Sequence, residues 1–139
     1  MNPPQVKALF INKERGLSSK AVDSVTATTS GLSGEYHTGS NSRRQILIQS
    51  VEALIDLDLV PGELFENMVV DGLELTDLIE GDKFQVGGAM IEITVPCEPC
   101  SKINHIRPGL IGEISGRRGH FARILSSGQI AIGDLLQKL

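Results

Sequence analysis

The sequence predicts a mainly β fold, in which an antiparallel sheet curls into a barrel and carries one or two short helices. Fifteen glycines, spread along 139 residues, divide the chain into many short segments. Several of these segments alternate apolar and polar residues with the period of two that is typical of strands. A barrel would also remove the exposed edges that a flat sheet leaves unpaired.

The first half of the chain is expected to hold four strands and one helix. The apolar and β-branched segments predicted as strands are residues 6–12, 22–29, 44–48 and 67–70. Residues 31–42, GLSGEYHTGSNS, form a polar, glycine-rich loop of a length that is often functional in a compact domain. Ser50 is expected to cap a helix over residues 51–57, with Glu52 well placed in the first turn.

The second half is expected to hold another short helix and two hairpins. Thr76 is predicted to cap a helix of one or two turns that ends at Gly81. A glycine pair between alternating runs predicts the first hairpin, because glycine readily adopts positive φ. A serine–glycine turn predicts a second hairpin of the same kind. The paired runs are residues 83–86 with 89–95, and residues 120–125 with 129–132.

Composition and charge exclude several classes of partner. The net charge of −4 and the aromatic content of 4% without Trp argue against nucleic-acid binding, which needs a basic surface and stacking side chains. No apolar run approaches the roughly 20 residues that span a bilayer. The first residues lack a proper signal peptide, so a cytoplasmic protein without a membrane partner is expected. Without a repeat or linker, residues 1–139 are interpreted as a single domain.

The two cysteines occupy a turn that follows an alternating strand over residues 91–95. Pro96 ends strand pairing, so Cys97 and Cys100 are expected at the end of a strand, where rigid scaffolds often carry reactive groups. In the cytoplasm they are expected as thiols rather than as a disulfide. Cys100 is favoured as a reactive or metal-facing thiolate, because a cation such as the nearby Lys102 lowers a thiol pKa.

Other interpretations of the cysteines stay open. Both could be small buried apolar side chains, which is common for free cysteine. A single zinc site with His105 and His120 is a further alternative, although a zinc ribbon would need two such cysteine pairs. A thioredoxin-like dithiol is disfavoured, because that motif normally begins a helix in a βαβ unit.

The glycine-rich loop around His37 is a second candidate site. Gly31 and Gly34 let the backbone approach a ligand closely, and its N–H groups could form a concave anion site. Arg44 follows the loop, and arginine suits phosphate through charge-assisted hydrogen bonds. Together these residues indicate a phosphorylated, acidic small molecule. The alternative is a solvated turn with a surface histidine.

Two later segments add polar candidates. Asn67, after Glu66, can donate and accept hydrogen bonds through its side-chain amide. It could therefore hydrogen-bond to the edge of a heterocycle or stabilise a turn. Arg117, Arg118 and Arg123 form a late basic cluster that could close over an anionic ligand or remain a solvated face.

Five segments, taken in order, make the chain resemble a MOSC domain. This module is found at the C-terminal end of molybdenum-cofactor sulfurases and in stand-alone bacterial proteins. The segments are GLSGEYHTG, RRQILIQSVEAL, VPGELFENMVVDGLELTDLIEGDKFQVGGAMIEIT, PCEPCSKI and GRRGHFARILSSGQIAIGDLL. They cover most of the chain and stand in the family's order and spacing.

The resemblance implies a domain that binds molybdenum cofactor (molybdopterin) and carries sulfur. Cys100 matches the family's cysteine, which would accept sulfur as a persulfide or ligate molybdenum. A sulfur donor or a molybdoenzyme is the implied protein partner, and the chain would act as a sulfur transferase or as a component of a molybdenum-dependent oxidoreductase. The residues expected to bind the cofactor are His37, Arg44, Glu66, Asn67, Gly31, Gly34, Lys102 and Arg118.

The chain also departs from the family pattern. Glu35 stands where the loop usually has Asp, and Cys97 is an addition. The sulfurases' pyridoxal-phosphate domain is absent, so no pyridoxal phosphate is expected here. Two alternatives remain, a non-catalytic module that chaperones the cofactor and a small structural zinc domain.

Overall fold

The computed structural model describes residues 3–14, 19–36, 39, 42–98, 103, 105–114 and 116–139. Its strands are β1 (Gln5–Ile11), β2 (Lys20–Val22), β3 (Ser24–Thr28), β4 (Gly31–Leu32), β5 (Ile46–Ser50), β6 (Met68–Asp71), β7 (Lys83–Val86), β8 (Ala89–Pro96), β9 (His120–Ser126), β10 (Gly128–Ala131) and β11 (Leu136–Lys138). The helices are α1 (Val51–Asp56), α2 (Leu110–Glu113) and the single 3-10 turn η1 (Leu75–Asp77).

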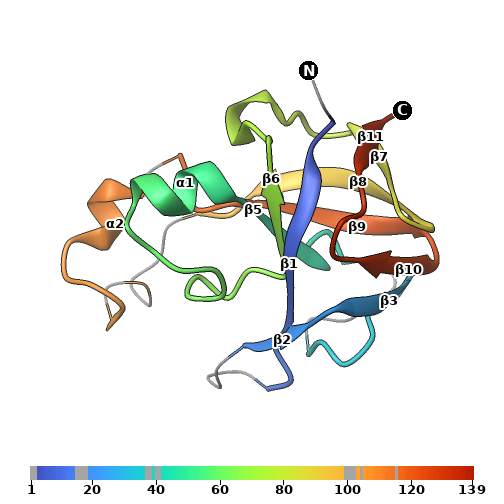
Figure 1. The fold of residues 1–139 in the computed structure, drawn as a ribbon, viewed down its shortest axis with the longest axis horizontal. Helices are drawn as coiled ribbons and strands as arrows, with labels where there is room; N and C mark the ends of the chain where they lie inside the picture. Colours follow the sequence, from blue (N-terminus) through green and yellow to red (C-terminus); the bar gives the residue numbers. More distant parts are fainter. Residues whose placement is uncertain are drawn as a thin grey trace.

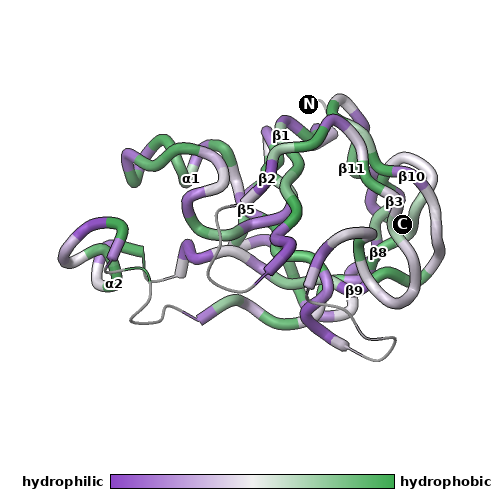
Figure 2. The backbone as a smooth tube through the Cα atoms, turned by 90° about the horizontal axis from the view of Figure 1, so that it is seen from below, coloured by the Kyte–Doolittle hydropathy of each residue, from purple (hydrophilic) through white to green (hydrophobic). Residues whose placement is uncertain are grey.

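The strands form one large curled sheet and one small sheet. The large sheet has the order β11-β7-β8-β9-β5-β6-β1-β2, and the small one has the order β10-β3-β4. All neighbours pair antiparallel except β5 and β6. The curl brings β11 back to β1, where Leu136 N–H donates to Pro4 O and Val6 N–H donates to Asp134 O. The strands therefore surround a common interior, and the described chain ends lie close together (Figures 1 and 2). The predicted curled β fold with short helices is confirmed.

Two apolar clusters hold this fold together. The larger one fills the inside of the curl with aliphatic side chains such as Ile48, Ile91 and Ile93. The smaller one joins the outside of the sheet to α1 and α2, which lie together at one side of the strands (Figure 1). It consists of Leu54, Leu57, Leu59, Leu64, Val69, Ile103, Leu110 and Ile114. The start of β6 thus contacts both clusters, because Met68 belongs to the larger one and Val69 to the smaller one.

The first predicted helix is confirmed, and the second is wrong. Ser50 Oγ accepts a hydrogen bond from Ala53 N–H and begins α1, as expected for an N-cap. The helix predicted from Thr76 to Gly81 is only the turn Leu75–Asp77. Leu75 and Leu78 are both buried, and one tight turn suffices to place them in the core.

The hairpin predicted at Gly87 and Gly88 is confirmed, because β7 and β8 pair across it. The second hairpin is wrong. Strand β9 pairs with β8 and β5, whereas β10 leaves for the small sheet and pairs with β3. Gly128 begins β10 and packs directly on the turn between β7 and β8, where a Cβ on Gly128 would lie 2.1 Å from Gly88 O. A close contact between distant segments, and not local pairing, therefore decides this region.

The segment predicted as one strand over residues 22–29 is divided. Strand β2 ends at Val22 and pairs with β1, and β3 begins at Ser24 and pairs with β10 and β4. The chain thus passes from the large sheet to the small one at Asp23.

Candidate functional site

The glycine-rich loop is fixed to the sheet through Glu35. This carboxylate is buried, and its Oε1 accepts hydrogen bonds from Asn12 N–H (2.7 Å), Asn12 Nδ2 (3.3 Å) and Asn67 Nδ2 (2.9 Å). Tyr36 N–H donates to Asn12 O at 2.9 Å. This carboxylate therefore ties the loop to the residue that follows β1 and to the residue that precedes β6. The sequence pattern placed Asn12 only at the end of a predicted strand and marked Glu35 only as a departure from the family pattern, so their contact was not predicted.

The predicted loop glycines serve turns beside this anchor. Gly31 has a φ of 127°, which disfavours any side chain, and it pairs with Thr28. Gly34 has a φ of 87°, and a Cβ there would lie 3.0 Å from Ile11 Cδ1. Both positions thus let the loop turn back onto the end of β1.

Asn67 uses both its amide N–H groups on protein partners. Its Nδ2 donates to Phe10 O and Glu35 Oε1, and its Oδ1 accepts from Leu47 N–H. Two roles were considered for this residue. The contacts favour stabilisation of the neighbouring backbone over hydrogen bonding to the heterocycle of a ligand. Asn67 thereby links β1, β5 and the loop at the start of β6.

Glu66 lies beside Asn67 and is fully buried. Leu64 N–H donates to its Oε1 at 3.1 Å, whereas Oε2 has no hydrogen-bond partner among the described residues. Burial raises the pKa of the Glu66 carboxyl above its ordinary value, although backbone N–H groups and the positive charge of Arg118 lower that pKa in part. Phe65 precedes it with a φ of 61°, a left-handed conformation unusual for an aromatic residue. Such strain often accompanies functional positions.

Arg118 is the charged counterpart of Glu66. It is only 6% exposed, and its Nε and Nη1 atoms have no hydrogen-bond partner within the part of the chain that the structure describes. The next residue, Gly119, has a φ of 120°, and a Cβ there would lie 2.8 Å from Ile48 O. Close packing against β5 therefore requires glycine beside Arg118.

The cysteine segment leaves the sheet next to Arg118. Strand β8 ends at Pro96, as predicted, and Cys97 N–H donates to Gly119 O at 2.9 Å. Cys97 is partly exposed, and its Sγ lies 3.9 Å from Glu98 O. Cys100 and Lys102 follow outside the described residues, as His37 does in the glycine-rich loop.

Arg44 lies over the outer face of β5 and β9. Its guanidinium is 5.5 Å from the centroid of the Phe121 ring, and Phe121 pairs with Leu47 across the two strands. Such a cation–π contact orients an exposed arginine without neutralising it. Arg44 and Arg118 thus approach the same pair of strands from opposite ends.

The structure does not gather the late arginines into one cluster. Arg117 reaches Asp56 on α1, and Arg123 bonds Glu92 at 2.6 Å across β9 and β8. Arg118 alone of the three is buried. Of the two alternatives considered for these arginines, closure of all three over one anion is therefore not favoured, because Arg117 and Arg123 each pair with a different carboxylate.

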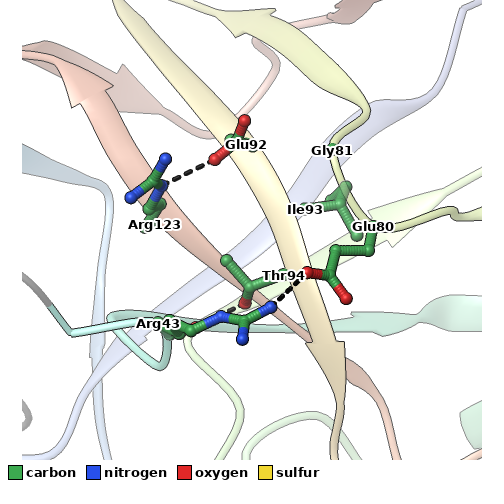
Figure 3. Close-up of a pocket in the computed structure, with 7 residues that line it drawn as sticks. All are labelled: Arg43, Glu80, Gly81, Glu92, Ile93, Thr94 and Arg123. Carbon is green, nitrogen blue, oxygen red and sulfur yellow. Dashed lines mark hydrogen bonds and ion pairs between the residues drawn. The ribbon is translucent and has the colours of Figure 1, made fainter.

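A shallow cavity of about 220 Å³ lies on the outside of β8 (Figure 3). Its lining residues are Arg43, Glu80, Gly81, Glu92, Ile93, Thr94 and Arg123. Figure 3 shows Arg43 reaching Glu80 and Arg123 facing Glu92, so both guanidinium groups are neutralised. This cavity lacks the unpartnered charge that Arg118 and Glu66 provide.

Metal ligands do not cluster in the described part of the chain, where no three His, Cys, Asp or Glu side chains are grouped to hold an ion. No helix among the described residues is long and apolar enough to cross a membrane.

The raised pKa of Glu66 predicts a specific pH dependence of stability. Because the pKa of Glu66 is higher in the folded than in the unfolded chain, binding of a proton to Glu66 stabilises the fold. This contribution is complete below the ordinary glutamate pKa of about 4.3 and is lost as the pH rises through the pKa of the folded state. The Glu66→Gln variant does not titrate there. Its free energy of unfolding, relative to wild type, should therefore rise with pH above that point, by at most about 1.4 kcal/mol per pH unit. Urea unfolding at several pH values measures this difference, and a pH-independent difference would contradict it.

Fold and site define a curled β domain in which a buried guanidinium and a buried carboxyl lie beside a cysteine-bearing strand end. The MOSC domain family matches residues 36–137 of this sequence. The chain belongs to the MOSC domain family, as the sequence motifs predicted. A comparison with curated proteins finds no match.

Solved structures share this fold. The YuaD protein of Bacillus subtilis superposes with a TM-score of 0.80 at 22% identity, over 94% of this chain and 92% of that one. YiiM from Geobacillus stearothermophilus gives 0.82 at 22% identity, over 99% and 75% of the two chains. YiiM from Escherichia coli gives 0.75 at 20% identity, over 97% and 69%. At these identities the likeness establishes the fold alone.

Proposed function

We propose that this MOSC domain binds molybdenum cofactor, or a related phosphorylated ligand, and that Cys100 accepts sulfur as a persulfide or ligates molybdenum. The observation that supports this most is the buried guanidinium of Arg118, with two nitrogens for which the described residues offer no acceptor. Buried donors normally have partners, so an unpartnered arginine fits an anionic group such as a phosphate. The family membership agrees with such a ligand.

The residues proposed to hold the cofactor come from separate segments. Arg44 and Arg118 would supply positive charge, and Glu66 would contribute a carboxyl beside Arg118. Asn67 would act by fixing the glycine-rich loop that carries His37, since Glu35 binds its amide. When bound, the cofactor would supply a molybdenum centre, for which a thiolate is a suitable soft ligand.

The proposed sulfur transfer begins with the Cys100 thiolate. It attacks the outer sulfur of a donor persulfide, an S–S bond forms on Cys100, and the donor's own S–S bond breaks. The donor leaves as a thiolate with the electron pair of that bond, and the proton of the donor persulfide stays on the transferred sulfur. No external oxidant is required, because the sulfur already has the persulfide oxidation level.

Cys100→Ser is expected to abolish sulfur acceptance. Purified protein is incubated with a persulfide donor, and intact-mass spectrometry with peptide mapping measures the gain of one sulfur atom. Wild type and the control Cys97→Ser should gain sulfur on Cys100, whereas Cys100→Ser should not, with unchanged thermal unfolding. Cofactor binding without sulfur on wild-type Cys100 would favour the chaperone alternative over the carrier. Zinc in stoichiometric amount, with unfolding on chelation, would favour the structural zinc domain.

A further inference from the structure

Glu66 and Arg118 form an unusual pair, because opposite charges are buried together without bonding. Glu66 is 0% exposed and Arg118 is 6% exposed. Glu66 Oε2 and the Nε and Nη1 atoms of Arg118 are the buried side-chain polar atoms without a hydrogen-bond partner in the described part of the chain. Arg118 nevertheless lies near enough for its charge to act on Glu66.

Stability alone does not account for this arrangement. A buried polar atom without a partner costs about 1–3 kcal/mol, and charged groups cost more. A structural ion pair would recover part of that cost through direct hydrogen bonds. Since this pair makes none, its unfilled bonding capacity is available to a third group. That group must offer acceptors to the guanidinium and an acceptor to a protonated carboxyl.

We propose that Arg118 and Glu66 together bind one tetrahedral oxyanion, and that Glu66 takes up a proton as the oxyanion binds. Arg118 donates N–H groups to two anion oxygens, and protonated Glu66 Oε2 donates its O–H to another. The proton comes from solvent, and no other bond forms or breaks. This inference rests on the proposed function for the identity of the ligand, whose phosphate would be the oxyanion. It adds that protonation of Glu66 controls the affinity of the site for that oxyanion.

The direction of the pH dependence follows from charge. An anion beside a carboxylate disfavours ionisation, so the pKa of Glu66 is higher in the complex than in the free protein. Oxyanion affinity is therefore strongest below the free-protein pKa and weakens as the pH rises toward the pKa of the complex. Between these values the fall approaches tenfold per pH unit, since one proton is linked.

Other charged groups of the surrounding elements are engaged elsewhere. Arg118 is the charged side chain that acts on Glu66 among the described residues. The remaining groups and their partners are Glu35 with Asn12 and Asn67, Glu63 with Val60 N–H, Glu52 with Gly72 N–H, Arg107 with Glu113, Arg117 with Asp56, and His120 with Phe121 O. The linked proton is therefore assigned to Glu66.

Inorganic sulfate tests the inference, because it does not titrate at neutral pH and needs no cofactor. Isothermal titration calorimetry measures its affinity between about pH 5 and about pH 8, in buffers of different ionisation enthalpy that report proton uptake. Wild type should bind more weakly as the pH rises and should take up protons. Glu66→Gln, which keeps a donor at that position, should bind without either effect. Arg118→Met should lose binding, and the matched Arg123→Met should bind as wild type.

Three results would overturn the inference: no sulfate binding by wild type, wild-type binding by a folded Arg118→Met, or an unchanged pH dependence in Glu66→Gln. Thermal unfolding of each variant establishes folding. The proposed function can fail separately. Protein that binds sulfate in this manner but never retains a pterin would contradict the proposal of cofactor binding, while the proposal of an oxyanion site would stand.

Discussion

Gly128→Ala is expected to lower the free energy of unfolding by about 3 kcal/mol or more. A Cβ at this position would lie 2.1 Å from Gly88 O and 2.8 Å from Ala89 N, and both neighbours are backbone atoms of the β7–β8 hairpin. Backbone cannot move aside as a flexible side chain can, so the small sheet must separate from the hairpin. Urea denaturation of the two proteins measures the loss.

Gly112→Ala is the matched control. Gly112 lies in α2, and a Cβ there would meet no atom within 4 Å. Alanine is a better helix former than glycine, so this variant should be neutral or more stable by up to about 1 kcal/mol. If Gly128→Ala were as stable as Gly112→Ala, the described contact between the two turns would be incorrect.

Asn67→Ala is the second substitution with a large expected effect, about 3 kcal/mol of destabilisation. The change removes three hydrogen bonds at once and leaves Leu47 N–H, Phe10 O and one side of the Glu35 carboxylate without this partner. Each of these groups is wholly or partly buried, so water replaces the lost bonds poorly. Chemical denaturation quantifies the loss, and faster proteolysis within residues 36–42 is expected, since the loop loses an anchor.

Gln85→Ala serves as its control, because Gln85 Nε2 also donates to a backbone carbonyl, Gly87 O, at an exposed position. Loss of that bond should change stability by no more than about 0.5 kcal/mol. Equal effects of the two substitutions would mean that Asn67 does not hold the three segments together.

Local patterns predicted the elements whose partners are adjacent in sequence. Gly87 and Gly88 between two alternating runs predicted the β7–β8 hairpin, and Ser50 predicted the start of α1. Both features depend on backbone preferences of a few residues, which a sequence displays directly. The same approach failed for β10, because its partner β3 lies about a hundred residues earlier and no local pattern indicates so distant a pairing.

The site was predictable in its residue types but not in their roles. The resemblance drew attention to Glu66, Asn67 and Arg44, yet composition cannot reveal that Asn67 already satisfies three neighbours. Arg118 and Arg123 looked alike in the sequence. In the described part of the structure, however, Arg118 is buried with two unpartnered nitrogens, whereas Arg123 pairs with the partly buried carboxylate of Glu92. Burial and partner choice are properties of the folded chain, and they distinguish the arginine proposed to bind from the one that serves as a control.

The most direct test is the molybdenum and pterin content of the protein purified from a host that makes molybdenum cofactor. Wild type and Arg123→Met should each retain pterin in near-stoichiometric amount, measured by fluorescence after oxidation, with molybdenum by mass spectrometry. Arg118→Met should retain at least about tenfold less, since a charge-assisted hydrogen bond is worth about 1.5–3 kcal/mol. Wild-type protein without pterin, or a folded Arg118→Met variant that retains as much as wild type, would contradict the account.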